Sequence, residues 1–256
     1  MPGMLEGKSV LITGGGSGIG RATALAATRE GANVAVADLD REGAEHTAEL
    51  ITQAGGRALA LQVDVTNEAQ VEVMVAAAED AFDGLDGAFN NAGISRGRDY
   101  EPGMLTGDLP LQAWRDVLDV NLDGVFLCLR QELKLMVPRA RGSIVNTASV
   151  AGLIGLAGAS PYTASKHAVI GLTKASALEY AESGVRINAL CPGYVKTPMT
   201  QSTATDEVHA SRMTRTPMSR YGVPEEVAEM VVWLLSDRSS FCTGSSFTVG
   251  GGIEAG

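Results

Sequence analysis

The chain has 256 residues, of which 45% are hydrophobic, and this supplies enough apolar side chains for the core of one large α/β domain. Its formal net charge of −10 disfavours a main activity at the phosphate backbone of nucleic acid or at an anionic membrane. The three cysteines and three histidines show no metal-ligand spacing, so the sequence predicts neither a disulfide framework nor a metal site.

The N-terminal segment and the lengths of the apolar runs predict the cellular location of the protein. The N-terminal segment lacks the basic start and apolar stretch of a signal peptide. No apolar run approaches the ~18–20 residues that would span a membrane. We therefore expect a cytoplasmic protein, and the lack of a linker, repeat or low-complexity tract predicts a single domain over residues 1–256.

Strand and helix patterns alternate along the chain. A short apolar run at Lys8–Thr13 leads into a glycine-rich turn, and a helical pattern follows until Gly31. We expect further strands at Asn33–Ala37, Arg57–Val63, Leu85–Phe89, Arg141–Ala148, Val185–Leu190 and Ser245–Val249, and further helices at Glu42–Ala54, Glu68–Phe82, Leu111–Val137, Thr163–Ser183 and Pro224–Leu235. This alternation predicts an α/β fold with a parallel sheet and right-handed crossovers.

The glycine-rich turn, Thr13–Gly20, has the spacing T-G-x-x-x-G-x-G rather than the strict G-x-G-x-x-G. A strand, a glycine turn and a helix together form a phosphate-binding unit. Glycines let the backbone approach a pyrophosphate, and the helix N-terminus supplies free N–H groups. The turn therefore predicts a dinucleotide site, with a generic glycine-rich turn as the alternative.

Acidic and small residues follow the next strands. Asp38 ends the second predicted strand, 20 residues after Gly18. A carboxylate there can accept hydrogen bonds from ribose hydroxyls and would repel a 2′-phosphate, which favours NAD over NADP. The alternative role for Asp38 is a helix N-cap. We expect Asp64-Val65 near an adenine, and the small residues of Asn90–Gly93 permit close approach of a ligand.

Two loops are candidates for the walls of a substrate pocket. Ile94–Pro110 is polar and glycine-rich, and its Arg96 and Arg98 could meet an anionic substrate, although solvated loop charge is the favoured interpretation. Tyr194–Gly222 is polar and Met-rich, and it is too long for a plain connection, which is typical of a lid or binding loop.

The candidate catalytic residues are Ser149, Tyr162 and Lys166. If Ser160 caps a helix with Pro161 at its first position, Tyr162 and Lys166 fall on one helical face. The lysine ammonium is then expected to lower the pKa of the tyrosine phenol. Ser149 follows the fifth strand, at the sheet edge where substrates bind. The alternative is that the tyrosine belongs to an interface and the lysine to a solvated face.

With these residues in hand, the chain resembles the short-chain dehydrogenase/reductase family over nearly its whole length. The resemblance consists, in the family's order, of the Thr13–Gly20 turn, Asp64, Asn90–Gly93, Asn121, Ser149, Tyr162 with Lys166, Pro192-Gly193 and Thr197. It implies a doubly wound seven-stranded Rossmann sheet flanked by helices and a nicotinamide cofactor. It also implies a homotetramer built through the helices that hold Asn121 and Lys166. The chain departs from many members in having Val249, not Asp, before its terminal glycines.

The resemblance also implies roles for individual residues. Tyr162 would exchange a proton with the substrate oxygen, Ser149 would hydrogen-bond that oxygen, and Lys166 would lower the pKa of the tyrosine and hold the nicotinamide ribose. From the residue pattern alone, an asparagine in the middle of a helix, such as Asn121, is expected to hold a kink or a water. The resemblance implies that Asn121 holds a water that links Lys166 to solvent. Expected cofactor contacts are Gly14, Ser17, Gly18, Ile19, Gly20, Asp38, Leu39, Asp64, Val65, Asn91, Ala92, Gly93, Tyr162, Lys166, Pro192, Gly193, Val195 and Thr197.

Three functional hypotheses follow. The first is an NAD(H)-dependent oxidoreductase that interconverts a secondary alcohol and its ketone, with a small-molecule substrate and no nucleic-acid or membrane partner. The second is an NADPH-dependent carbonyl or 3-oxoacyl reductase. The third is a non-catalytic dinucleotide-binding regulator, although such proteins typically lose the tyrosine or the lysine that this chain keeps. Low charge on the expected pocket lining, with scattered Met and Leu, favours an apolar or weakly polar substrate.

Overall fold

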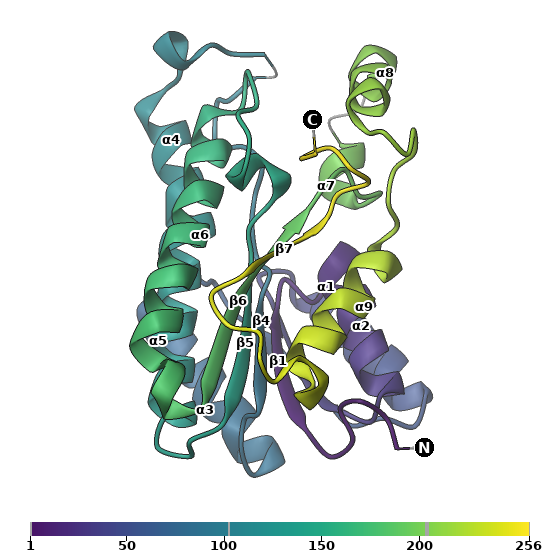
Figure 1. The fold of residues 1–256 in the computed structure, drawn as a ribbon, viewed down its shortest axis with the longest axis vertical. Helices are drawn as coiled ribbons and strands as arrows, with labels where there is room; N and C mark the ends of the chain where they lie inside the picture. The colour runs from purple at the N-terminus through teal and green to yellow at the C-terminus, as the bar shows by residue number, and fades with distance from the viewer. Residues whose placement is uncertain (1, 102, 203–204, 256) are drawn as a thin grey trace.

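The computed structural model describes residues 2–101, 103–202 and 205–255. These residues form a seven-stranded parallel sheet in the order β3-β2-β1-β4-β5-β6-β7 (Figure 1). The strands are β1 Ser9–Thr13, β2 Asn33–Asp38, β3 Ala58–Gln62, β4 Gly87–Asn90, β5 Gly142–Thr147, β6 Val185–Pro192 and β7 Ser246–Val249. The order reverses between β1 and β4, which is the position where open α/β sheets bind their ligands. The predicted Rossmann fold is therefore confirmed.

Helices cover both faces of the sheet (Figure 1). One face carries α1 (Gly18–Arg29), α2 (Arg41–Gln53) and α9 (Pro224–Leu235), and the other carries α3 (Glu68–Phe82), α5 (Gly124–Met136) and α6 (Ser160–Tyr180). The remaining helices, α4 (Leu111–Leu118), α7 (Pro198–Gln201) and α8 (Asp206–Arg215), extend beyond the carboxyl ends of the strands. Short 3-10 turns lie at Thr106–Asp108, Val150–Gly152, Ala181–Ser183 and Asp237–Ser239.

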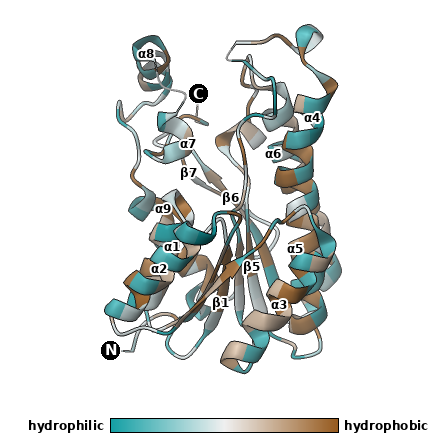
Figure 2. Ribbon diagram, turned by 180° about the vertical axis from the view of Figure 1, so that it is seen from behind, coloured by the Kyte–Doolittle hydropathy of each residue, from teal (hydrophilic) through white to brown (hydrophobic). Residues whose placement is uncertain are grey.

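The central strands are largely buried because helices cover both of their faces. All five residues of β1 are buried, and the central strands are correspondingly brown in Figure 2. Phe89 of β4 is among the largest fully buried side chains, and truncating such a residue to alanine typically costs about 3–5 kcal/mol. On the α1 side, the buried Ala24 and Ala27 belong to the same core cluster as Val231 of α9. This core fixes the strand ends that carry the site.

The structure differs from the predicted helices at three places. The helix predicted at Leu111–Val137 is interrupted by a π-helical turn at Asp119–Asp123, between α4 and α5. Ser160 does not cap α6, because the N-cap is Ala159 and Ser160 is the first helical residue, although Pro161 does lie in the first turn. The Tyr194–Gly222 loop holds the two short helices α7 and α8, and residues 203 and 204 lie outside the described part of it.

A chain of buried polar side chains crosses the core between α5, the sheet and α6. Asn90 donates hydrogen bonds from Nδ2 to Oε2 of Glu132 and to Oδ1 of Asn146, each at 3.0 Å. Asn146 in turn donates from Nδ2 to Oγ1 of Thr173 at 3.0 Å. Glu132 is completely buried, and burial raises its pKa from an ordinary value of 4.5 to about 8. Glu132 therefore keeps its proton at neutral pH.

The described residues offer neither a membrane-spanning helix nor a cluster of metal-ligating side chains. No helix there is long and apolar enough to cross a bilayer. The same residues contain no group of three His, Cys, Asp or Glu side chains that could hold a metal ion. Cys128, Cys191 and Cys242 are free thiols.

Candidate active site

The glycine-rich turn has a backbone that only glycine adopts without strain. Gly14 and Gly18 have φ of +63° and +51°, in the left-handed region. At Gly20 a Cβ atom would lie 2.0 Å from the carbonyl oxygen of Gly14, so no side chain fits between the turn and α1. Ser17 is the N-cap of α1 but makes no capping hydrogen bond with its side chain. The helix N-terminus is thus arranged as in an anion-binding site.

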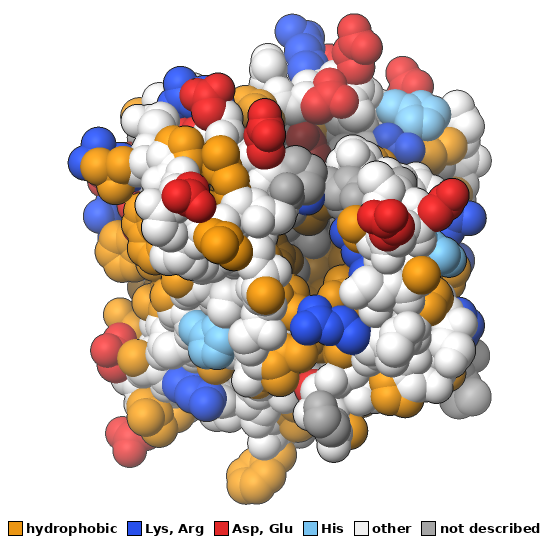
Figure 3. All heavy atoms as spheres, turned by 90° about the horizontal axis from the view of Figure 1, so that it is seen from above, with side chains coloured by type: hydrophobic (Ala, Val, Ile, Leu, Met, Phe, Trp, Pro, Cys, Tyr) orange, Lys and Arg blue, Asp and Glu red, His pale blue; other side chains and the backbone are white. Residues whose placement is uncertain are grey.

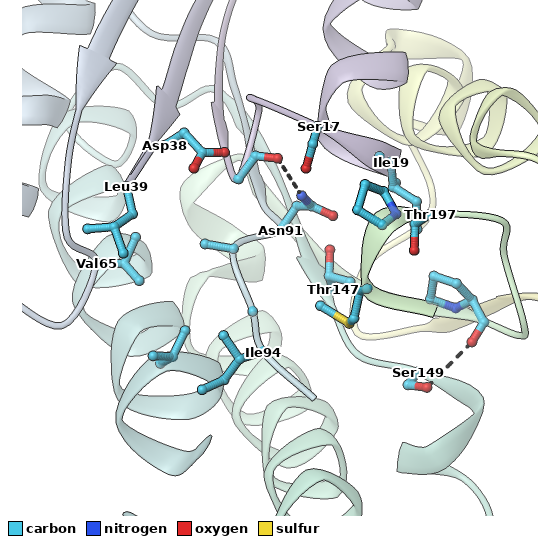
Figure 4. Close-up of a pocket in the computed structure, with 18 of the residues that line it drawn as sticks. Ser17, Ile19, Asp38, Leu39, Val65, Asn91, Ile94, Thr147, Ser149 and Thr197 are labelled. Atoms are coloured by element: carbon cyan, nitrogen blue, oxygen red, sulfur yellow. Dashed lines mark hydrogen bonds between the residues drawn. The ribbon is translucent and has the colours of Figure 1, made fainter. Parts of the chain in front are cut away.

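A cavity of about 560 Å³ runs from this turn along the carboxyl ends of the strands. Figure 3 shows a hollow in this face of the molecule. In Figure 4, Asp38, Leu39 and Val65 lie at one end of the cavity and Ser149 at the other, with Asn91 between them. The structure thus brings together nearly all of the predicted site residues, because the strand ends that carry them meet at one edge of the sheet.

Two predicted residues, Gly20 and Asn121, do not line the cavity, and several lining residues were missed. The residues missed altogether are Ala37, Asp40, Val63, Val120, Thr147 and Ala148, whereas Ile94, Pro198, Met199 and Thr200 belong to the two loops predicted as pocket walls. Most of them adjoin a predicted residue in the sequence, so the signal that could have found them is simply their position at a strand end.

Asp38 is held at the turn by two backbone amides. Its Oδ2 accepts from the N–H of Gly16 at 2.8 Å, and its Oδ1 accepts from the N–H of Asp40 at 2.9 Å. The N-cap of α2 is Asp40, so the alternative role of Asp38 as a helix cap is wrong. The nearby Arg41 pairs with Glu45 at 2.7 Å and does not line the cavity.

Hydrogen bonds tie the end of β4 to the glycine-rich turn. Asn91 donates from Nδ2 to the carbonyl oxygens of Thr13 at 3.1 Å and Gly14 at 3.2 Å. The hydroxyl of Thr13 accepts from the N–H groups of Asn91 and Ala92 at 3.0 and 3.1 Å. Thr13 and Asn91 therefore hold two walls of the cavity in register.

Ser149, Tyr162 and Lys166 gather at the other end of the cavity. Oγ of Ser149 accepts from the N–H of Ala151 at 3.1 Å. Nζ of Lys166 is buried, donates to the carbonyl oxygen of Thr147 at 2.7 Å, and lies 5.6 Å from the centre of the Tyr162 ring. The predicted juxtaposition of a tyrosine and a lysine on one helical face is therefore present.

The pKa values of this pair differ from the sequence-based prediction. Burial raises the pKa of Tyr162 above its ordinary value, although an interaction with Ser149 acts in the opposite direction. Burial lowers the pKa of Lys166 to about 8. The expected lowering of the tyrosine pKa is thus wrong. The physical reason is that burial disfavours the charged form of each side chain, the phenolate of Tyr162 and the ammonium of Lys166.

Asn121 is part of the π-helical turn and is completely buried. Its Oδ1 accepts from the N–H of Ile94 at 2.8 Å, and its Nδ2 donates to the carbonyl oxygen of Ile94 at 2.8 Å and to Oγ of Ser165 at 3.2 Å. A Cβ atom added at Gly93 would lie 3.1 Å from Oδ1 of Asn121 and 3.6 Å from Nζ of Lys166. Asn121 thus joins the loop after β4 to α6 beside the lysine, and its predicted water stays a prediction.

The Tyr194–Gly222 loop closes the cavity on the side of β6. Thr197 caps α7, because its Oγ1 accepts from the N–H of Thr200 at 3.4 Å while Oγ1 of Thr200 accepts from the N–H of Thr197 at 3.0 Å. Thr197 and Val195 both line the cavity. At the end of β6, Gly193 donates its N–H to the carbonyl oxygen of Val249 at 3.1 Å, so the departure at Val249 leaves this strand end paired.

Comparisons with known proteins agree with this geometry. A family model described as enoyl-(acyl carrier protein) reductase matches residues 14–254. The chain is 42% identical over 254 residues to 2,5-dichloro-2,5-cyclohexadiene-1,4-diol dehydrogenase of Sphingobium indicum strain B90A, with 98% of each chain covered. It is 43% identical over 252 residues to cyclohexanol dehydrogenase of Acinetobacter sp. strain SE19, with 98% of this chain and 96% of that protein covered.

A solved structure gives the same result. The crystal structure of levodione reductase superposes with a TM-score of 0.91 at 38% identity, with 98% of this chain and 99% of that chain covered. The chain therefore belongs to the short-chain dehydrogenase/reductase family, whose members are oxidoreductases that use a nicotinamide dinucleotide.

Proposed function

We propose that this protein is an NAD(H)-dependent oxidoreductase that interconverts a secondary alcohol and its ketone. The observation that carries the proposal is a continuous cavity that joins the glycine-rich turn and Asp38 to Ser149, Tyr162 and Lys166. The relatives named above include dehydrogenases of a cyclic diol and of cyclohexanol, which supports the same reaction class.

The charges along the cavity support NAD rather than NADP. The described lining residues at the Asp38 end carry only negative charge, from Asp38, Asp40 and Asp64. Arg21, which lies in the first turn of α1, donates instead to the carbonyl oxygen of Gly16 and to Oγ1 of Thr47. A 2′-phosphate would therefore meet carboxylates without a basic partner, whereas ribose hydroxyls can donate to Asp38.

The side chains at the other end can perform the proton transfer. Bound NAD⁺ supplies the hydride acceptor. Tyr162 takes the hydroxyl proton of the alcohol, and Ser149 donates a hydrogen bond to the substrate oxygen as its charge develops. Lys166 would hold the nicotinamide ribose, and its positive charge would oppose the burial that raises the pKa of Tyr162. Nζ of Lys166 is held beside Gly93 by its hydrogen bond to the carbonyl oxygen of Thr147.

The first experiment is to measure NADH formation from NAD⁺ with a panel of secondary alcohols, cyclic diols, sugars and hydroxysteroids. NADP⁺ and the Tyr162→Phe protein are run alongside. We expect turnover of one substrate class with NAD⁺ that the Tyr162→Phe protein loses while it still binds NADH. Equal turnover by wild type and Tyr162→Phe would falsify the assigned role of the tyrosine, and equal use of NADP⁺ would contradict the role of Asp38.

The remaining sequence-based expectations stay predictions. We propose that residues 1–256 act as one domain, with Tyr194–Gly222 as the substrate loop. A homotetramer and a cytoplasmic location also stay predictions, and size-exclusion chromatography with light scattering tests the former.

A further inference from the structure

A second, smaller cavity adjoins the candidate catalytic residues. Its volume is about 170 Å³, and its lining includes both Ser149 and Tyr162. Pockets for drug-sized ligands usually measure about 300–1,000 Å³, so this cavity suits a compact molecule. Its other walls come from the Ile94–Pro110 and Tyr194–Gly222 loops and the turn before α6.

The charges that line this cavity all have one sign. Among the described lining residues the charged side chains are Arg96 and Arg212, and none is a carboxylate. Apolar side chains such as Val150, Leu156 and Met199 form much of the remaining wall. Two guanidinium groups beside an apolar cavity are unexpected in a chain whose formal net charge is −10.

Arg96 forms no ion pair with a carboxylate in the described structure. It is half-buried, and its guanidinium lies 5.9 Å from the centre of the Tyr100 ring. The exposed Asp99 follows in the same loop and makes no salt bridge with it. Arg98, two residues away, behaves differently, because it donates to both carboxylate oxygens of Asp116 at 2.9–3.0 Å. A partly desolvated cation without a counter-ion is costly unless a ligand supplies the negative charge.

Arg212 reaches the same cavity from α8. Its Nη1 donates to the carbonyl oxygen of Thr200 at 2.9 Å, and its guanidinium lies 5.4 Å from the centre of the Tyr194 ring. These contacts fix the side chain at the cavity wall. A guanidinium presents five N–H donors in a rigid plane, which suits recognition of a carboxylate.

We propose that the substrate is a compact secondary alcohol or ketone that carries a carboxylate, which Arg96 binds together with Arg212. The inference rests on the proposed function, because it requires the substrate oxygen at Ser149 and Tyr162 while the carboxylate occupies the arginine side of the same small cavity. It replaces the weakly polar substrate that the sequence favours. The rim of the hollow carries several carboxylates (Figure 3), so the recognition must come from short-range contacts within the cavity.

The test compares two ketones of the same shape that differ in charge, 4-oxocyclohexanecarboxylate and 4-oxocyclohexanecarboxamide. Their NADH-dependent reduction is measured with wild type, Arg96→Met and Arg215→Met. Arg215 lies on α8 but is exposed and outside the cavity, so its variant controls for the loss of one positive charge. We expect the kcat/KM of wild type to be at least about tenfold higher for the acid than for the amide, because one hydrogen bond to a charged group typically gives a ratio of this size.

Arg96→Met should lower kcat/KM for the acid by about tenfold to a hundredfold and leave the amide within about threefold, whereas Arg215→Met should change neither appreciably. Equal kcat/KM for acid and amide in wild type, or an equal effect of Arg96→Met on both, overturns the proposal. Arg96→Lys should restore part of the preference, because it returns the charge without the planar donor pair.

A binding measurement separates this inference from the proposed reaction. Each ketone is titrated calorimetrically into the protein with NAD⁺ present, so that no reduction can occur. Tighter binding of the acid that Arg96→Met abolishes supports the carboxylate site even if neither ketone is reduced. Reduction of the amide without preference for the acid supports the reaction and overturns the carboxylate site. No difference between the two ketones in either assay overturns the carboxylate site.

Discussion

Glu132→Gln should change how the stability of this protein depends on pH. Glu132 is completely buried and accepts one hydrogen bond from Asn90, and burial raises its pKa from 4.5 to about 8. The hydrogen bond from Asn90 acts in the opposite direction and is the smaller effect. Glutamine has nearly the same shape and can still accept from Asn90, but it has no proton to lose.

The sign and size of the effect follow from the two pKa values. Below pH 4.5 the folded and unfolded chains both hold the proton, so Glu132 carries no penalty. Between pH 4.5 and about 8 only the folded chain holds it, so the unfolded state binds fewer protons and stability falls as pH rises. One pKa unit corresponds to about 1.4 kcal/mol, so the full loss reaches up to about 5 kcal/mol above pH 8.

The assay is the unfolding temperature of wild type and Glu132→Gln at pH 5.5 and 7.5, with the exposed Glu72→Gln as a control. Over that interval wild type should lose about 2–3 kcal/mol that Glu132→Gln keeps. For a protein of this size the gap in Tm should widen by about 5–10 °C. Parallel pH dependence of wild type and Glu132→Gln would refute the reasoning, because it would mean that the buried carboxyl does not hold its proton across neutral pH.

Three further predictions concern the cofactor and the reaction. Asp38→Ala should weaken NADH binding at least about tenfold and reduce the preference over NADPH, and fluorescence titration with both cofactors checks this. Gly20→Ala should abolish NADH binding, because its Cβ would meet the carbonyl oxygen of Gly14 at 2.0 Å; unchanged binding would show that the turn relaxes. The kcat/KM for alcohol oxidation should rise as the pH increases through the neutral range, because burial raises the pKa of Tyr162 and oxidation needs its phenolate; a flat profile would contradict this.

Sequence patterns predicted most elements because short apolar runs, such as the one in β1, alternate with longer helical patterns that end at glycine or proline. The helices α3 and α9 were predicted to the residue. The interruption at Asp119–Asp123 was missed because one extra residue in a helical turn shifts the register without removing the apolar residues on either side. The predicted N-cap of α6 was wrong because Ser160 is already the first helical residue, and no local pattern shows that Ala159 precedes the helix instead.

The strand-end residues of the site were predictable, but the state of their side chains was not. Lys166 follows Tyr162 by four residues, so any helix here places the two side chains on one face. The pKa of Lys166, however, depends on its burial beside the carbonyl oxygen of Thr147, which comes from β5. Arg96 and Arg98 cannot be distinguished from the sequence. In the structure Arg98 pairs with Asp116 of α4, whereas Arg96 lines the smaller cavity. Such differences arise from contacts between distant segments, which local patterns do not record.

The π-helical turn has a consequence for the lengths that this chain can have. Gly124 donates its N–H to the carbonyl oxygen of Asp119, five residues back rather than four, so the turn holds one residue more than an α-helix would. Deleting that residue would rotate the following helix by about 100° relative to α4. Either Asn121 would leave its contacts with Ile94, or Glu132 and its neighbours on α5 would turn away from the sheet. A deletion here would therefore break either the contacts of Asn121 at the site or those of Glu132 in the core. Substitutions at the exposed Asp119 and Asp123 leave the number of residues in the turn unchanged, so both sets of contacts can persist.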